Sequence, residues 1–281
     1  RDGMIRVSGR EYTGLLKTAC FQKGEMSCLS CHSVHDSSPN FQVSRGMESN
    51  AACLQCHQSF AAKLEEHTHH PANSAGSLCY NCHMPYTSYG LLKGIRAHQI
   101  SSPTIKASLQ TGRPDACNLC HLDKTLDWAG QKLTAWYKQP REELSVKEKS
   151  VAASVLWATQ GDAGQRGLIA WHMGWEPARQ ISGENWLPPY LATLMQDDYP
   201  AVRCIAGRSL KSLRGFERVP YDYVAEDKLR DAAKLVFAQW QKLTKPKENP
   251  SLLLGKNGDL QDEQLRELLA GQNHRVVNLN E

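Results

Sequence analysis

The most regular pattern of apolar positions in this chain lies between residues 198 and 213. Apolar residues recur there at the spacing of one face of an α-helix. They are Val202, Ile205, Ala206, Leu210 and Leu213. Pro200 stands just before them, and proline is favoured in the first turn of a helix. The segment therefore predicts a helix that begins near residue 200 and buries one face.

The rest of the second half predicts further helices separated by turn residues. Gly161-Asp162 and Pro188-Pro189 punctuate the pattern, and Gly271 closes the last helix. Helices that are apolar on one face bury it by packing on neighbouring helices. We therefore expect a mainly α fold with little or no β structure. The expected helices are roughly 146–159, 163–174, 186–196, 222–243 and 259–270.

The first half has no comparable periodicity. Glycine, serine, asparagine and proline are frequent before residue 126, and apolar residues are too few for an ordinary core. One short helix is expected over 59–66, ended by Pro71. The hydropathy pattern alone predicts a disordered segment, so a stable fold here requires a core that apolar side chains do not supply.

The cysteines provide that component. Eight of the ten cysteines fall in four copies of the pattern C-x-x-C-H, which attaches haem c. The two thiols bond to one edge of the porphyrin, and the histidine then lies under the iron as a neutral imidazole. The four motifs are Cys28, Cys31 and His32; Cys53, Cys56 and His57; Cys79, Cys82 and His83; and Cys117, Cys120 and His121.

Two other uses of paired cysteines explain the pattern less well. Half-sites of the form C-x-x-C can combine into zinc sites, and an even number of cysteines can form a disulfide framework. Neither gives a reason for a histidine after every second cysteine of the four motifs. We therefore predict four covalent haems c packed within residues 1–125, followed by helical repeats over 126–220 and a helical extension over 221–281.

Nine of the eleven histidines lie before residue 122, and five of them are outside the motifs. Four irons would use four of these five as distal ligands. We select His35, His67, His70 and His98, and leave His69 spare. His35 follows His32 too closely to reach the opposite face of the same iron, so it would ligate a neighbouring haem. Which histidine serves which iron stays open.

Several of these motifs carry a family resemblance. Residues 79–86 (CYNCHMPY) and 96–100 (RAHQI) resemble multihaem cytochromes related to the pentahaem nitrite reductases and the tetrahaem cytochrome of ammonia oxidation. Residues 115–124 (DACNLCHLDK), followed by Trp128, resemble a narrower group in which a haem region precedes a helical repeat domain. The resemblance implies that His67, His70 and His98 are ligands. It also implies that four haems are a minimum, because related chains often carry more motifs upstream.

The segment 198–203 (DYPAVR) resembles the start of the second helix of a HEAT repeat. Such repeats bury their faces by stacking on neighbours. A docking scaffold for other proteins and a structural cap on the haems are both compatible with this half. His172 lies on an apolar helix pattern and is expected to be a packed residue. Cys204 is expected to be buried on its helix, and Cys20 and Cys204 could form a disulfide.

Two functions compete. Iron with two histidine ligands has no open position for a substrate, which favours electron transfer between redox partner proteins. The alternative is a haem enzyme that acts on a small nitrogen or sulfur oxyanion at an open iron, or a conductive subunit of an oligomer or larger cytochrome complex. No C-x-x-C-K motif is present. The fourth motif would be the candidate open site, because no histidine follows His121 until His172. We expect an electron carrier and assign no catalytic residue.

Charge and hydropathy limit the setting. The net charge is +4 at pH 7, and each oxidised haem would add about −1, so the total with four haems is about zero. No run of lysine and arginine indicates nucleic-acid binding, and no stretch approaches ~20 apolar residues. The chain starts at Arg1 without a signal peptide, yet haem c is attached outside the cytoplasm. We therefore expect a mature, trimmed or partial chain that is periplasmic or extracellular.

Overall fold

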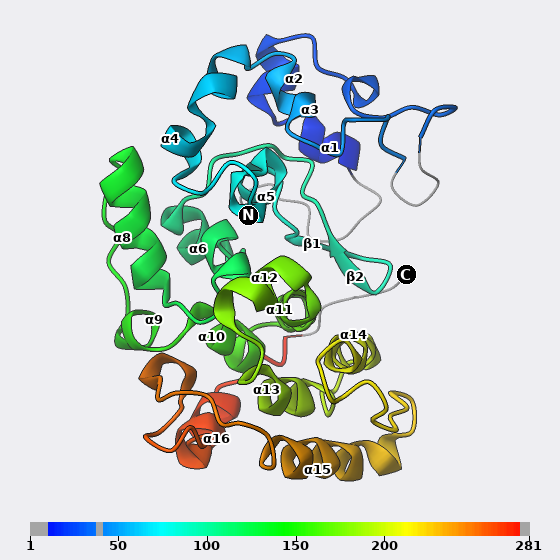
Figure 1. The fold of residues 1–281 in the computed structure, drawn as a ribbon, viewed down its shortest axis with the longest axis vertical. Helices are drawn as coiled ribbons and strands as arrows, with labels where there is room; N and C mark the ends of the chain where they lie inside the picture. Colours follow the sequence, from blue (N-terminus) through cyan, green and yellow to red (C-terminus); the bar gives the residue numbers. More distant parts are fainter. Residues whose placement is uncertain (1–10, 38–41, 276–281) are drawn as a thin grey trace.

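The structure is a computed structural model, and it describes residues 11–37 and 42–275. The described residues form sixteen α-helices and one two-stranded antiparallel sheet. The helices that follow residue 145 stack in the lower part of Figure 1, and the shorter elements of the first half lie above them. The predicted class, mainly α with little β, is confirmed.

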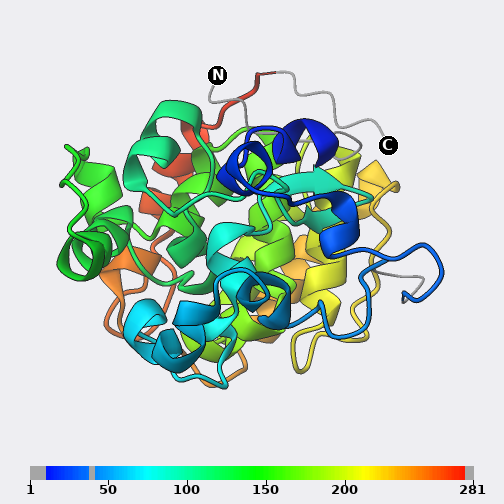
Figure 2. The ribbon, with the colours of Figure 1, turned by 90° about the horizontal axis from the view of Figure 1, so that it is seen from above.

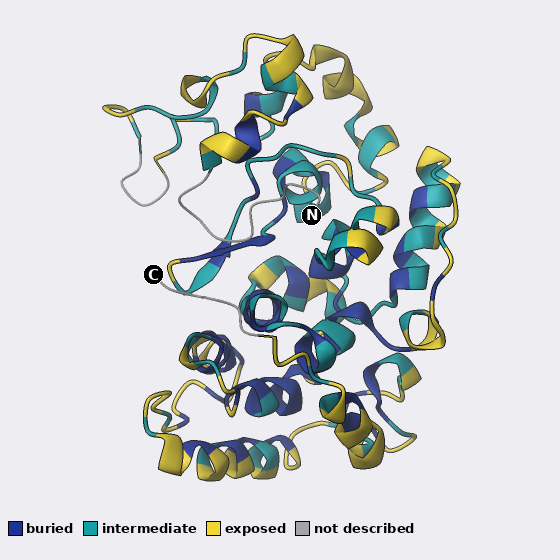
Figure 3. Cartoon of the chain, turned by 180° about the vertical axis from the view of Figure 1, so that it is seen from behind, coloured by how far each residue is buried: buried dark blue, intermediate teal, exposed yellow. Residues whose placement is uncertain are grey.

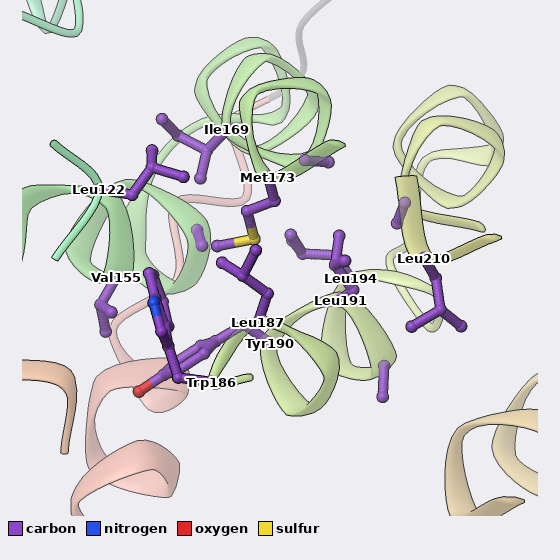
Figure 4. Packing of buried hydrophobic residues seen from close by; sticks show 14 of the residues in the cluster. Leu122, Val155, Ile169, Met173, Trp186, Leu187, Tyr190, Leu191, Leu194 and Leu210 are labelled. Atoms are coloured by element: carbon purple, nitrogen blue, oxygen red, sulfur yellow. The ribbon is translucent and has the colours of Figure 1, made fainter. Parts of the chain in front are cut away.

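The second half contains the main side-chain core. It is formed between packed helices whose apolar faces point inward, and Met173, Leu187 and Leu191 are fully buried at its centre (Figure 4). In Figure 1, α15 lies along the lower edge beneath α13. The principal helices are α10 (Ala153–Gln160), α11 (Ala163–Gly174), α12 (Glu176–Ser182), α13 (Leu187–Leu194), α14 (Pro200–Lys211), α15 (Leu229–Trp240) and α16 (Asp262–Ala270).

Helix positions predicted from local signals are confirmed. Helix α11 begins with a capping box, in which the Asp162 side chain accepts a hydrogen bond from the Gln165 backbone and the Gln165 side chain accepts one from the Asp162 backbone. Helix α14 begins at Pro200, as the proline signal predicts. Helices α13 and α16 lie within the predicted ranges, with ends that differ by three residues or fewer. Helix α15 begins only at Leu229, so the predicted start near residue 222 is wrong.

The helix predicted over 146–159 is instead two helices, α9 (Val146–Ser150) and α10. Val151 and Ala152 between them are not helical, and the Ala152 N–H donates to the Ser251 carbonyl at 2.8 Å. This hydrogen bond comes from a segment far along the chain. A tertiary contact therefore interrupts segment 146–159, whose local sequence pattern predicts a single helix.

A buried ion pair joins α11 to the turn before α14. The Arg166 guanidinium donates to both carboxylate oxygens of Asp197, at 2.5 and 3.0 Å, and both side chains are almost fully buried. A third hydrogen bond runs from Arg166 Nη1 to the Gly161 carbonyl at 2.7 Å. Bidentate geometry and the added hydrogen bond offset the cost of removing these charges from water.

The first half is made of short helices with few buried apolar side chains. Among its described residues, the buried apolar side chains before residue 115 are those of Leu15, Ala52, Tyr80, Pro85, Tyr89, Ala97, Ile105 and Pro114. Figure 3 shows mostly intermediate and exposed residues here, against the dark core of the second half. Its helices are α1 (Glu11–Leu15), α2 (Ala19–Lys23), α3 (Ala51–Leu54), α4 (Leu64–Thr68), α5 (Cys79–His83), α6 (Ile105–Thr111) and α7 (Ala116–Cys120), with 3-10 turns η1 (Cys28–Ser30), η2 (Gln58–Lys63) and η3 (Ala75–Ser77).

An aromatic cluster connects the two halves beside the small sheet, β1 (Ser88–Gly90) and β2 (Lys93–Ile95). The Tyr86 ring lies 4.6 Å from that of Trp171 and 5.5 Å from that of Trp175. His172 is 1% exposed, and its Nε2 donates to the Tyr86 carbonyl at 3.0 Å. His172 is thus a packed residue, as predicted, and burial lowers its pKa to about 4.

Removing one partner of the buried ion pair should destabilise the helical half strongly. Asp197→Asn leaves the Arg166 charge buried without a counter-charge, which costs about 3–5 kcal/mol. Asp231→Asn is the control, because its ion pair with Lys234 is exposed on both sides and is worth less than ~1 kcal/mol. Urea unfolding followed by far-ultraviolet circular dichroism compares them; equal losses would show that the buried pair has no special role.

The stability of the joint between the halves should depend on pH through His172. Its folded pKa, about 4, lies below the ordinary value of about 6.5, so the unfolded chain binds the proton more readily. The stabilising contribution is complete above pH ~6.5 and is lost as the pH falls towards 4, by roughly 3 kcal/mol in all. His172→Gln keeps a donor for Tyr86 and removes this titration. Unfolding at pH 7 and pH 5 should therefore differ less in the variant; an unchanged difference would exclude His172 as the source.

Candidate haem-binding site

Each C-x-x-C-H motif folds as one tight helical turn. In the first, second and fourth motifs, the N–H of the histidine donates to the carbonyl of the first cysteine at 2.9, 2.9 and 2.8 Å. The third motif is helix α5 itself. Asp115 caps the turn of the fourth motif by accepting a hydrogen bond from the Cys117 N–H at 2.9 Å. The turn brings both thiols and the histidine to one site, as attachment to one porphyrin requires.

Six histidines from distant parts of the first half meet in three pairs. Each pair joins one motif histidine to one histidine that the sequence predicts as a distal ligand. The pairs, with ring-centroid distances and interplanar angles, are His32 with His98 (6.2 Å, 20°), His83 with His67 (6.2 Å, 4°) and His121 with His70 (6.1 Å, 36°).

The spacing within these pairs fits a metal ion between the two rings. A bond from a metal to an imidazole nitrogen is about 2 Å, and the ring centroid lies roughly 1 Å behind the nitrogen, so two imidazoles on opposite sides of one ion have centroids about 6 Å apart. Direct stacking is closer, as His69 on Trp136 shows at 4.4 Å. The residues present therefore fit a haem iron held by two histidines.

Hydrogen bonds at Nδ1 orient four of the six rings. A backbone carbonyl can only accept, so Nδ1 carries the proton and Nε2 keeps the lone pair that a metal requires. Burial also lowers the pKa of His83, His98 and His121, which favours the neutral imidazole. The bonds are His32 to the Gln42 carbonyl (2.8 Å), His70 to that of Thr68 (2.6 Å), His83 to that of Ser101 (3.2 Å) and His98 to that of Arg96 (3.2 Å).

The cysteines show that consecutive motifs are neighbours. The Cys53–Cys79 hydrogen bond, between the second and third motifs, raises the pKa of Cys53 and lowers that of Cys79 to about 7. Burial raises the pKa of Cys82 to about 12, and nearby Asp115 and Cys120 add to the effect. The attachment points of the second and third motifs, and of the third and fourth, thus lie side by side.

Helix α8 (Leu126–Tyr137) holds the turn that carries His67 and His70. His69 between them has a left-handed backbone (φ 57°), which is unusual without glycine, and its ring stacks on Trp136. The Tyr137 hydroxyl donates to the His67 carbonyl at 2.6 Å. The spare histidine of the sequence therefore anchors the turn and lets its two neighbours face different motif histidines. Sequence reasoning did not identify this role of α8, although its Trp136-Tyr137 pair is visible in the sequence.

The second motif differs from the other three. His57 is exposed, and the ring beside it is Phe60, at 6.4 Å. His35, predicted as a distal ligand, is also exposed, and within the described residues no ring contact joins it to another histidine. Sequence reasoning made the fourth motif the candidate open site, whereas the structure places His70 beside His121.

The two cysteines outside the motifs are free thiols and do not form the disulfide considered from the sequence. Cys204 is half-buried on α14, with Arg208 Nη2 at 3.8 Å from its sulfur. The expectation of a buried Cys204 is therefore wrong, because this position lies at the edge of the apolar face of its helix.

One family comparison matches part of the chain. The family described as "Doubled CXXCH motif" matches residues 19–62, which contain the first two motifs. No curated protein and no solved structure matches. The match indicates covalent haem c binding and the electron-transfer chemistry of multihaem c-type cytochromes. Within the residues described, none of the helices combines the length and the apolar character needed to span a bilayer.

Loosening the α8 contacts should disturb the two predicted ligands, His67 and His70, on the turn it holds. Trp136→Ala removes the stack that supports His69, and Tyr137→Phe removes a hydrogen bond worth about 1 kcal/mol. We expect the low-spin electron paramagnetic resonance (EPR) signals of two haems to shift while the others stay. Tyr223→Phe, in the helical half, is the control. Identical spectra for all variants would show that α8 does not position these ligands.

Proposed function

We propose that this chain is a c-type cytochrome with four covalent haems that passes electrons between redox partner proteins. The observation that carries the proposal is the set of three imidazole pairs spaced for one metal ion each. Iron with two imidazole ligands has no free position for a substrate and exchanges electrons without changing its ligands. Electron transfer therefore accounts better for these pairs than catalysis does.

The proposed ligands follow the pairs. His98 completes the iron of the first motif, His67 that of the third and His70 that of the fourth. Residues His67 and His70 come from one turn, so the third and fourth haems would share a rigid support in α4 and α8. His35 stays a sequence prediction, and the proposal does not depend on it.

The order of the motifs supports an electron path along the chain. The adjacent cysteines of consecutive motifs, such as Cys53 with Cys79 and Cys82 with Cys120, would bring neighbouring porphyrin edges together. Haem c supplies the one-electron chemistry when it is bound. The protein attaches each haem, supplies imidazoles in the correct tautomer and partly shields the pairs from water.

The helical half has its own core and would serve as a docking scaffold or cap, in a monomer or in a larger cytochrome assembly. We propose a periplasmic or extracellular location, because haem c is attached after export. We propose no nucleic-acid partner, because the sequence contains no run of lysine and arginine. The redox partners would be proteins that exchange electrons with the exposed edges of the haem half.

Two neighbouring histidines provide the sharpest test. His70→Ala removes a proposed ligand and should convert one haem from low-spin to high-spin in the EPR spectrum of the oxidised protein. His69→Ala, one position earlier, removes the stack on Trp136 and should shift low-spin signals as Trp136→Ala does, but it should convert no haem to high-spin, because its ring contacts Trp136 instead of another histidine. Mass spectrometry should find four haems in both. A spin change in His69→Ala, or none in His70→Ala, would contradict the proposed pairing.

A companion measurement tests electron transfer itself. Voltammetry of the protein on an electrode should show reversible couples whose currents do not rise when nitrite or sulfite is added. A catalytic current would instead identify an enzyme acting on an oxyanion.

A further inference from the structure

The eleven histidines of the chain all lie within the described residues. Six form the three pairs described above, and three others have different partners: His69 stacks on Trp136, His172 is buried against Tyr86, and His274 lies 3.5 Å from Asp198. Two remain, His35 and His57. Because His57 belongs to the second motif, the second haem is the one for which the described residues provide no paired distal histidine.

The surroundings of His57 differ from those of the other motif histidines. His32 and His83 are partly shielded, hydrogen-bonded at Nδ1 and paired with a second imidazole. His57 is exposed, and the described residues provide it with neither a hydrogen bond at the ring nor a second imidazole. The second haem therefore lacks the arrangement that prepares the other sites for two histidine ligands.

The side chain beside His57 cannot ligate iron. Phe60 lies in the turn η2 directly after the motif, 38% exposed, with its ring 6.4 Å from that of His57 and 4.6 Å from that of His67. This apolar ring stands between the unpaired histidine and the ligand of the next haem. A partly open site with an apolar wall suits a small ligand without charge better than an oxyanion, which needs donors.

Among the described residues, no ring contact joins His35 to His57. His35 is exposed, and its segment is held on both sides by isolated bridges, His32 with Val43 and Ser37 with Ser44. Within that segment the Asp36 N–H donates to the Ser33 hydroxyl at 2.9 Å. These contacts hold the backbone of the turn that carries His35.

We propose that the haem attached at Cys53 and Cys56 keeps an exchangeable sixth position, which binds small linear ligands such as carbon monoxide. The inference rests on the proposed function, since it assumes that haem occupies this motif. It adds a ligand-binding site to a protein whose other three irons are closed by imidazole pairs. Ligand binding at this haem would change its potential and so control electron flow through the row of haems.

Carbon monoxide added to the reduced full chain tests the proposal, with the optical change normalised to total haem. One haem in each chain should respond, and EPR of the oxidised protein should show a single high-spin haem. His35→Ala should leave both results unchanged, as should its control His274→Ala, at another exposed histidine. A wild-type protein that is entirely low-spin and does not bind carbon monoxide would overturn the proposal. If His35→Ala then created the responsive haem, His35 would be the ligand.

Two further variants locate the site. Phe60→Trp should lower the carbon monoxide affinity by about tenfold through crowding, whereas Phe237→Trp on α15 should not. Replacing Cys53 and Cys56 by serine should remove one haem together with carbon monoxide binding. Replacing Cys28 and Cys31 by serine should also remove one haem, but carbon monoxide binding should be retained. Binding that survives the loss of Cys53 and Cys56 would contradict the assignment.

The same data separate this proposal from the proposed function. Fewer than four haems would contradict the proposed haem content, and more than one high-spin haem in the wild type would contradict the imidazole pairs. Either result would contradict the proposed function. Four low-spin haems would contradict only the exchangeable position.

Discussion

The first half of this protein depends on the space between paired imidazoles. Rings such as His67 and His83 are nearly parallel yet stand 6.2 Å apart, a separation that leaves room for a metal ion between them. Side chains alone cannot stabilise such an arrangement, because they leave the half with few buried apolar groups. The short elements of this half instead bring their histidines together in the three pairs. In the view from above, these elements lie over the helices of the second half (Figure 2).

The second half, in contrast, has an ordinary core of buried apolar side chains. Its helices bury ordinary apolar faces around Met173 and Leu191, and the Arg166–Asp197 ion pair connects α11 to the turn before α14. It can therefore be stable independently of cofactors and serve as a rigid base. The Tyr86 cluster and α8 contact both halves and so hold the haem half against this base. Helix α8 is the clearest case, because Tyr137 and Trp136 hold the turn that carries His67 and His70.

Local signals determined what could be predicted. The capping box at Asp162 and the proline at position 200 define α11 and α14 through neighbours in sequence. The C-x-x-C-H motifs are equally local. The break at Ala152 could not be predicted, because its hydrogen-bond partner, Ser251, is far along the chain. For the same reason the sequence limited the distal ligands to a few histidines but did not pair His98 with His32, or show that the second motif, rather than the fourth, has an unpaired histidine.

The position of the irons tests the central claim most directly. Anomalous diffraction at the iron absorption edge, from crystals of the haem-loaded protein, locates each iron without reference to the protein structure. We predict one iron between the rings of each pair, His32 with His98, His67 with His83 and His70 with His121, and a further iron beside His57. Irons that lie elsewhere, or pairs with no iron between them, would contradict the account.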